Sequence, residues 1–279
     1  MIDPARLLAF EFPEIVHSYT RRDTILYALG IGIGADPLDR AHLQYVYEEG
    51  LVALPTMAVT LASPGFWYRD LDTGLDFERT VHGAEYVAIH AELPVEGTVA
   101  ARTRIVDVID KGADKGALVV SERVVRNRAD GRLLATVRQT AFCRGDGGFG
   151  GPQRSEPRPP APPDRPADHV KELSTLPQAA LIYRLSGDPN PLHVDPEAAR
   201  DAGFERPILH GLCTMGVVCH AAVGALFGGR PAGLKAMECR FTAPVFPGDA
   251  IRSEFWAVSD GWQFRATVGG RAVAVGNVS

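Results

Sequence analysis

The chain has 279 residues, of which 46% are hydrophobic, and its formal net charge is -5 at pH 7. A chain of this length can bury one large core or two modest ones. The acidic balance argues against a general nucleic-acid-binding protein, which needs a surplus of Lys and Arg, so we expect no nucleic-acid partner.

The cysteines and the start of the chain indicate the compartment. Cys143, Cys213, Cys219 and Cys239 lie far apart and form neither a C-x-x-C motif nor a metal-ligand spacing, which is typical of buried thiols in a reducing compartment. Residues 1–6 lack the basic start and apolar run of a secretory signal. No stretch of about 18 uninterrupted apolar residues occurs, so we expect a cytoplasmic protein with no membrane span.

The first predicted helix covers residues 22–30 and ends in a glycine-rich loop. Asp23 is placed to act as its N-cap, and the apolar residues that follow fall on one helical face. Gly30, Gly32 and Gly34 have part of the spacing of a dinucleotide-binding loop. However, no strand precedes them and no helix opens directly after them, so we expect a helix that ends in a flexible loop.

Residues 43–62 predict one short element followed by a buried helix. Residues 43–49 fit a strand or a short helix, whereas residues 51–62 are almost entirely apolar. Pro55 fits the first turn of that helix, because the N–H group it lacks would have no partner there.

The pattern then changes to the alternation that is typical of strands. Strands are predicted at residues 86–90, 99–108, 117–125 and 133–142, with a turn at residues 129–132 between the last two. Long neighbouring strands after one buried helix indicate a curved antiparallel sheet wrapped around that helix.

Residues 145–168 interrupt this pattern with glycine and then with proline-rich, core-poor sequence. Such a composition predicts an extended surface linker. The chain is therefore expected to consist of a first unit at residues 1–144, a linker at 145–168 and a second unit at 169–279.

The second unit repeats the first. Leu181–Gly187 corresponds to Leu26–Gly32, and Ala243–Asp249 echoes Leu93–Thr98. Pro207–Phe227 corresponds to the buried helix near Pro55, and the last strands are joined by a Gly-Gly-Arg hairpin signal. Two copies of a helix-plus-antiparallel-sheet unit indicate an internal duplication.

The most informative stretch, Tyr183–His193, reads Y-R-L-S-G-D-P-N-P-L-H. Its glycine and prolines predict a tightly bent, rigid loop. This loop holds Asp188 and His193, with the amide of Asn190 between them. A carboxylate and an imidazole directed at one point suit the transfer of a proton to or from water near neutral pH. Asp-Pro-Asn-Pro is also an ordinary turn sequence, in which Asp188 would only cap the turn.

The run Tyr183–His193 resembles the signature of the R-specific enoyl-CoA hydratases, also called hydratase 2 or MaoC-like dehydratases, and the resemblance extends over both halves. It implies an α+β architecture of two hotdog folds fused into a pseudo-dimer. It also implies reversible syn hydration of a trans-2-enoyl-CoA to a (3R)-3-hydroxyacyl-CoA, with water activated by Asp188 and His193. Which of the two removes the proton is open, because protons in a coupled pair belong to the pair.

Three further residues are assigned to the site. Asn190 either orients the water or locks the loop through its amide. Gly211 opens the second buried helix, where unpaired N–H groups would stabilise an enolate oxygen, and the resemblance places the oxyanion contact there; simple helix–sheet packing is the alternative. His210 either lines the site or caps the helix.

The duplication is asymmetric at this point. Where the second copy has Gly187–His193, the first has Gly32–Leu38, which ends in Asp36-Pro-Leu without a histidine. Leu54-Pro-Thr likewise stands in place of Leu209-His-Gly. The first half is therefore expected to keep the fold without catalysis, and the resemblance implies that it accommodates the acyl chain.

The remaining histidines show no metal-ligand spacing and are assigned to structure: His17, His42, His82, His90, His169 and His220. Cys213 and Cys219 are expected to be core residues of the buried helix, and Tyr183 to pack beneath the loop.

No metal and no redox cofactor is implied, and coenzyme A enters only as the carrier of the acyl substrate. Its phosphates would need basic residues, for which Arg206, Lys235 and Arg240 are candidates. A homodimer is expected, because a hotdog sheet edge invites pairing.

Two other functions fit the same fold. A thioesterase would use a carboxylate to activate water against the thioester carbonyl, although hotdog thioesterases generally lack the whole Tyr183–His193 string. A non-catalytic acyl-thioester-binding subunit would need only the pocket, and it would not need both titrating groups.

Overall fold

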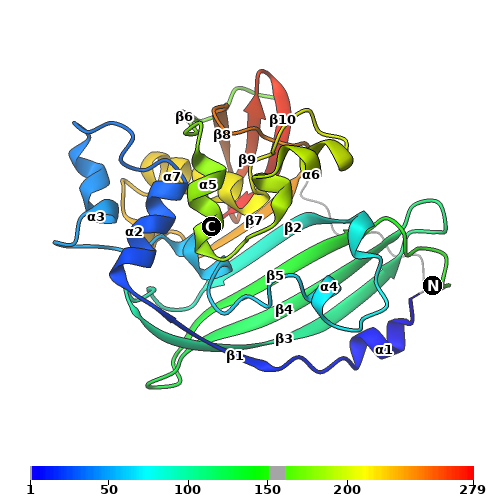
Figure 1. The fold of residues 1–279 in the computed structure, drawn as a ribbon. Helices are drawn as coiled ribbons and strands as arrows, with labels where there is room; N and C mark the ends of the chain where they lie inside the picture. The colour runs from blue at the N-terminus through cyan, green and yellow to red at the C-terminus, as the bar shows by residue number, and fades with distance from the viewer. Residues whose placement is uncertain (1, 151–160) are drawn as a thin grey trace.

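The computed structural model describes residues 2–150 and 161–279, and its centre is one antiparallel sheet of ten strands (Figure 1). Along the sheet the order is β1-β3-β4-β5-β2-β7-β10-β9-β8-β6. The strands are β1 (Glu14–Tyr19), β2 (Thr80–Ile89), β3 (Gly97–Asp110), β4 (Ala117–Asn127), β5 (Leu133–Cys143), β6 (His169–Ser174), β7 (Ala236–Phe241), β8 (Ala250–Val258), β9 (Gly261–Val268) and β10 (Arg271–Val278). The predicted strands of the first half and the C-terminal hairpin are confirmed.

The two halves join through the pairing of β2 with β7. Ala84 lies opposite Arg240 and Ala88 opposite Ala236, so one continuous ladder passes from the first unit to the second. This pairing closes one edge of each half-sheet and leaves β1 and β6 at the two ends. The order of strands agrees with two copies of one unit placed edge to edge.

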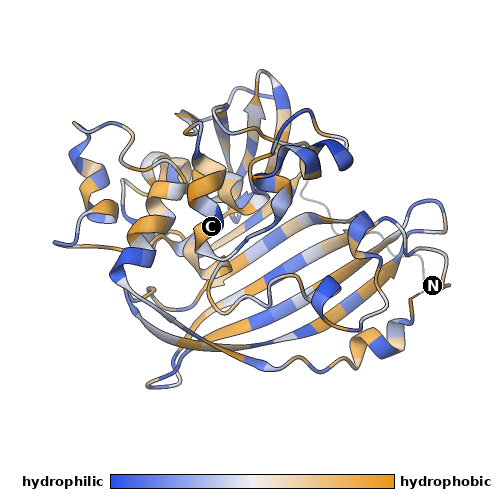
Figure 2. Cartoon of the chain, in the orientation of Figure 1, coloured by the Kyte–Doolittle hydropathy of each residue, from blue (hydrophilic) through white to orange (hydrophobic). Residues whose placement is uncertain are grey.

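Alternating sequence is what forms these strands. On β3, Val99, Ala101 and Ile105 are buried, while Arg102 and Arg104 between them are exposed. Successive side chains of a strand point to opposite faces, so this pattern buries one face of the sheet. Figure 2 shows the same alternation of hydrophilic and hydrophobic residues along the strands of the first half.

The second half of the sheet wraps around helix α7 (Gly211–Leu226), as predicted. A helix that is apolar on all sides is expected in a core, and α7 contacts β6, β7, β8 and β10. Most of its side chains are fully buried.

The long buried helix expected at residues 51–62 in the first half is absent, which corrects the sequence-based prediction. The segment forms only η2 (Pro55–Val59), a five-residue 3-10 helix. Pro55 and Pro64 leave too few residues between them for a long helix, and Ala62 adopts a left-handed φ of 48°. The segment is nevertheless buried, because Met57, Ala58 and Leu61 still face the core.

Short helices and 3-10 turns cover the rest of the described chain: α1 (Pro4–Leu8), α2 (Arg21–Gly30), η1 (Arg40–His42), α3 (Leu43–Val46), α4 (Trp67–Asp70), η3 (Phe77–Arg79), α5 (Ala179–Tyr183), η4 (Arg184–Ser186), η5 (Pro191–His193), α6 (Pro196–Asp201) and η6 (Pro231–Gly233). Helix α2 begins one residue earlier than predicted, with Thr20 as its N-cap. Asp23 accepts hydrogen bonds from the Thr20 backbone N at 2.8 Å and hydroxyl at 2.7 Å. The role of Asp23 is thus that of the third helical residue in a capping box.

Within the described residues, every helix is too short or too polar to cross a bilayer. The predicted linker at 145–168 lies partly outside the described residues, since 151–160 are not among them, and the division into 1–144 and 169–279 stays a prediction.

Candidate active site

The predicted loop lies between α5 and α6 and is shaped by its own backbone. Gly187 follows η4 with a φ of 113°, a left-handed conformation that glycine adopts without a steric penalty. Asn190 then caps η5, since its side-chain oxygen accepts a hydrogen bond from the backbone N of Leu192 at 3.0 Å. These two features shape the bend that carries Asp188 and His193.

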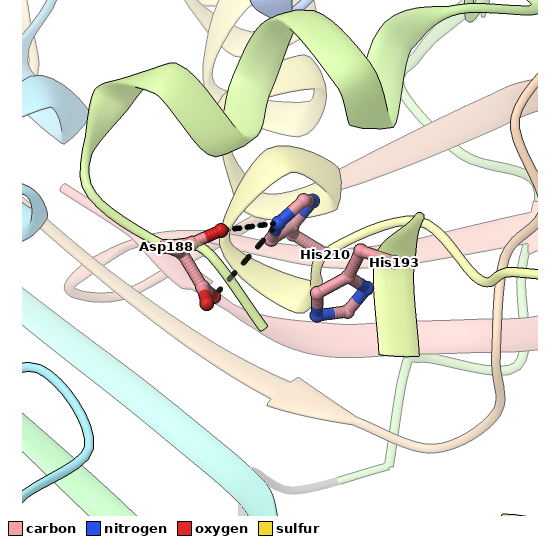
Figure 3. Close-up of side chains that lie close together, drawn as sticks. All are labelled: Asp188, His193 and His210. Carbon is pink, nitrogen blue, oxygen red and sulfur yellow. Dashed lines mark hydrogen bonds and ion pairs between the residues drawn. The ribbon is translucent and has the colours of Figure 1, made fainter. Parts of the chain in front are cut away.

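Asp188 is the more accessible member of the site, with a side chain that is 33% exposed. Its Oδ1 accepts a hydrogen bond from the backbone N of Asn190 at 3.2 Å. Its carbonyl oxygen accepts one from His210 Nε2 at 3.2 Å, and its carboxylate Oδ2 lies 4.0 Å from the same nitrogen (Figure 3). Asp188 therefore does cap the turn, as the alternative interpretation expected, but it uses only Oδ1 for this. Its Oδ2 lies toward His210.

His193 is buried, and its tautomer follows from its partner. The His193 Nδ1 lies 2.8 Å from the carbonyl oxygen of Ile208. Because a carbonyl oxygen can only accept, Nδ1 must carry the proton, and in the neutral ring Nε2 keeps its lone pair. Burial lowers the pKa of His193 below its ordinary value, an effect that the Asp188 charge and the Ile208 carbonyl oppose. The ring is thus held neutral, with Nε2 free to accept a proton.

His210 links the two predicted catalytic residues. It is 1% exposed and immediately precedes α7, and its ring stacks on His193 with centroids 3.6 Å apart. Burial, with a smaller contribution from His193, lowers the pKa of His210 to about 2. A neutral His210 that donates through Nε2 to Asp188 holds the loop against the start of α7. Sequence reasoning left His210 between lining the site and capping a helix; it occupies the N-cap position of α7, but its side chain makes no capping bond and contacts Asp188 and His193 instead.

Beneath these rings lies Tyr183, as predicted. Its ring is 5.1 Å from that of His210 and 5.9 Å from that of Tyr27 in the first half. Gly30 of α2 packs against the Tyr183 backbone, where an added Cβ would come within 3.2 Å. The platform of the site therefore depends on packing between the two halves.

Gly211 is the first residue of α7, as predicted, and the N–H groups of the first helical turn have no partner within the helix. Its Cα faces the ring of Phe241 on β7, which a Cβ would approach to 3.2 Å. Phe241 in turn contacts His82 of the first half edge-on, with ring centroids 5.0 Å apart. This arrangement is compatible with both roles suggested for Gly211, the oxyanion contact and simple packing of the helix against the sheet.

A cavity of about 110 Å³ opens beside the loop. It is lined by Leu185, Ser186 and Gly187 from the loop and by residues of β1, α2 and η2 from the first half: His17, Tyr19, Asp23, Leu26, Tyr27, Met57, Thr60 and Leu61. The walls of this cavity therefore come from both halves of the chain.

Asp188, His193 and His210 together offer three donor atoms that all lie within 4.8 Å of one another, which is a spacing that could hold a metal ion. His210 Nε2 already carries the proton that it donates to Asp188. That nitrogen would have to lose its bond and its proton to become a ligand. The chemistry of the donor set therefore fits a bound water better than a metal, and the absence of a metal cofactor stays a prediction.

The basic residues suggested for coenzyme A are not brought together. Arg206 lies two residues before Ile208, close to His193, and its guanidinium packs over Phe246. Lys235 lies just before β7, and its Nζ donates to the Ala232 carbonyl at 2.7 Å. The assignment of Arg206, Lys235 and Arg240 to the phosphates of coenzyme A therefore stays a prediction.

Sequence reasoning missed the residues of the first half that approach the site. Burial is the main cause of the raised pKa of Tyr68 and of Tyr183, and the charges of Glu85 and Asp188 add to both shifts. The available signal was Glu85, a carboxylate at a position of β2 where alternation predicts an inward-facing side chain.

Comparisons with known proteins agree with both halves. Residues 17–145 match the family model described as MFE-2 hydratase 2 N-terminal domain, and residues 159–276 match the one described as MaoC like domain. Enoyl-CoA hydratase ChsH3 of Mycobacterium tuberculosis is 37% identical over 273 residues, which cover 96% of this chain and 93% of that protein. 3-hydroxyacyl-thioester dehydratase Y of the same organism is 39% identical over 271 residues, covering 96% and 92%. The crystal structure of a MaoC-like dehydratase from Phytophthora capsici has a TM-score of 0.85 at 32% identity and covers 99% of this chain and 98% of its own.

Proposed function

The chain belongs to the family of MaoC-like dehydratases and hydratase 2 enzymes, and we propose that it catalyses the reversible syn hydration of a trans-2-enoyl-CoA to a (3R)-3-hydroxyacyl-CoA. Its relatives are named for the hydration and for the dehydration of thioesters, which are the two directions of one reaction. The enzyme is a hydro-lyase built on two hotdog units, of which only the second carries the Asp188–His193 pair.

One observation carries the proposed mechanism, which is the distance across the site. A carboxylate oxygen of Asp188 and a ring nitrogen of His193 lie within 4.8 Å of each other. Two hydrogen bonds of about 2.8 Å reach up to about 5.6 Å, so one water can bond to both groups at once. A water held in this way is oriented before the substrate arrives.

The proton transfers then balance without an external acid or base. One member of the pair removes a proton from the water as its oxygen forms the bond to C3 of the enoyl group. The π electrons move toward the thioester carbonyl as an enolate, and the proton held by the pair is returned to C2. Since the pair and the water lie on one side of the substrate, both additions occur on the same face, and dehydration is the reverse sequence.

The enolate oxygen needs hydrogen-bond donors, which the start of α7 supplies. The Gly211 N–H is unpaired within the helix, and the positive end of the helix dipole favours a developing negative charge. Glycine at this position lets the thioester approach the backbone closely. We assign Asn190 to the loop, with its side-chain NH₂ group as a third contact for the water.

The first half contributes binding rather than chemistry in this proposal. Its helix is reduced to η2, and it has no counterpart of the Asp188–His193 pair. We propose that the acyl chain extends over η2 and the inner face of β2, β4 and β5. Coenzyme A is the carrier only, and no resident cofactor is required.

Hydration of crotonyl-CoA, followed as loss of the enoyl absorbance with a chiral assay of the product, tests the proposal. We expect a (3R) product. Release of free thiol from saturated acyl-CoA would indicate a thioesterase instead. If neither crotonyl-CoA nor a long or bulky enoyl-CoA is hydrated, a non-catalytic binding subunit becomes the better account.

We also propose a cytoplasmic homodimer. Four buried free cysteines support a reducing compartment, and the exposed edge strand β6 offers unpaired backbone groups to a second chain. Analytical ultracentrifugation distinguishes a dimer from a monomer, and microscopy of a labelled chain tests the compartment.

A further inference from the structure

A band of polar side chains crosses the inner face of the first half-sheet. Glu85 on β2 lies opposite Gln139 on β5, and Gln139 lies opposite Ser121 on β4. Two residues further along β4, Arg123 lies opposite Thr103 on β3. These five residues occupy inward positions that alternation would otherwise assign to apolar side chains, and we call them the polar band.

The charged members of the polar band are buried, and no described ion pair joins them to each other. Glu85 is 2% exposed and Arg123 is 6% exposed. None of the described ion pairs joins Glu85 to Arg123. The Glu85 carboxylate instead lies 3.0 Å from His82 Nε2. A buried guanidinium is retained at a cost of several kcal/mol unless its donors are satisfied.

The donors of Arg123 are satisfied only in part. Arg123 donates from Nη2 to the carbonyl of Val59 in η2, while its Nε has no partner in the described part of the chain. The hydroxyl of Thr103 and the indole Nε1 of Trp67 on α4 are likewise buried without a partner there. Native proteins leave few such groups, and each calls for a polar atom that the folded chain does not supply.

The polar band lies next to the active site. Tyr68 on α4, which lies across β4 and β5 in Figure 1, donates its hydroxyl to Gln139 at 2.5 Å. His82, whose Nε2 lies 3.0 Å from the Glu85 carboxylate, contacts the ring of Phe241 edge-on, and that ring packs against Gly211 of the active site. Val59, which binds Arg123, belongs to η2, the segment that replaces the long helix. An acyl chain that leaves the catalytic water toward the first half therefore meets the polar band.

We propose that the polar band is a subsite for an acyl chain that carries a neutral oxygen function, a ketone or a hydroxyl, beyond its reacting carbons. The ligand oxygen accepts from Arg123 Nε, the Thr103 hydroxyl or Trp67 Nε1. A hydroxyl can also donate to Glu85. A carboxylate in the same place is disfavoured, because it would lie beside the buried negative charge of Glu85. The assignment rests on the hydratase function proposed above.

The polar band therefore predicts a preference for acyl chains that carry an oxygen over plain hydrocarbon chains, which an apolar tunnel would not show. A hydrocarbon chain leaves the donors of Arg123 and Thr103 unsatisfied, whereas an oxygen at the right carbon satisfies one or more of them. A hydrogen bond to a charged donor changes kcat/KM by about tenfold or more.

The test compares matched enoyl-CoA substrates on one enzyme. A straight-chain trans-2-enoyl-CoA is compared with oxo analogues of equal length, with the ketone moved along the chain one carbon at a time. For the wild type we expect one ketone position to raise kcat/KM about tenfold over the hydrocarbon. In Arg123→Met and in Thr103→Val this ratio should fall toward one, because each change removes a donor and keeps most of the volume.

Arg126→Met is the matched control, since Arg126 lies on the same strand with an exposed side chain on the outer face. It should keep the wild-type ratio. Using a ratio measured on each variant cancels a general loss of activity, and Thr103→Val decides the matter if Arg123→Met does not fold.

A hydrocarbon preferred at every ketone position, or an unchanged ratio in Thr103→Val, would overturn the subsite while leaving the hydratase function intact. A chain carrying a carboxylate that outperforms the ketone would overturn the assignment of a neutral oxygen. Failure to hydrate any enoyl-CoA would instead overturn the proposed function.

Discussion

The rings of His193 and His210 stack in the active site with centroids 3.6 Å apart and planes inclined by 27°. Burial lowers the pKa of both rings, and proximity of the two rings adds to the effect on His210. Two positive charges cannot be held at this distance in a buried site, so the stack is a feature of the neutral pair.

The acid limb of the pH–rate profile should therefore lie below pH 6.5, the ordinary pKa of histidine. Hydration needs the free lone pair of His193 Nε2, which is lost only when the pH falls through the lowered pKa. The folded state resists protonation that the unfolded state accepts, so the free energy of unfolding should also fall as the pH drops below 6.5. Measurements of kcat/KM and urea unfolding against pH check both.

Because the Asp188 charge raises the pKa of His193, Asp188→Asn should lower that pKa further. NMR titration of the ring measures it, and a shift to higher pH would contradict this account.

Asp188→Asn should lower kcat for crotonyl-CoA hydration by about a hundredfold or more, since the amide can neither take up nor return a proton and the pair loses one of its two titrating groups. The side chain is partly exposed and the shape is unchanged, so circular dichroism and thermal unfolding should match the wild type. Affinity for a saturated acyl-CoA, measured by calorimetry, should be retained. A variant that turns over at the wild-type rate would remove Asp188 from the chemistry.

Two substitutions separate the roles of the oxygen and the NH₂ group in the Asn190 side-chain amide. Asn190→Asp keeps an acceptor for the Leu192 N–H, whereas Asn190→Ala loses it and should cost about 1 kcal/mol of unfolding free energy. If the NH₂ group contacts the water, kcat should fall in both variants. Normal turnover in Asn190→Asp would restrict Asn190 to a structural role in the loop.

Gly211→Ala should lower kcat/KM by about tenfold or more, because the new Cβ would meet the Phe241 ring at 3.2 Å and displace the start of α7 from the substrate. Gly224→Ala on the same helix is the matched control. No atom lies within 4 Å of the Cβ added there, and alanine should stabilise the helix by up to about 1 kcal/mol without changing turnover. Equal activity in the two variants would remove Gly211 from the oxyanion contact.

Most of the fold followed from local patterns. Alternation along β3 and β4, the hairpin glycines before Arg271 and the all-apolar run of α7 each specify an element through interactions within a few residues. The prediction of a long helix in the first half was wrong because burial alone does not make a helix. Pro55 and Pro64 break the run, and packing keeps the segment buried in a 3-10 form.

By itself the sequence determined the catalytic loop, because the left-handed Gly187, the Asn190 cap and the two prolines fix its bend through backbone restrictions that act between neighbours. Only the tertiary structure decided what surrounds that loop. The His193–His210 stack, the approach of Tyr68 and Glu85, and the buried Arg123 depend on the β2–β7 pairing and on the side of α7 that faces the first half. Such contacts join residues far apart in the chain, and their geometry is set by the packing of whole elements, which no local pattern encodes.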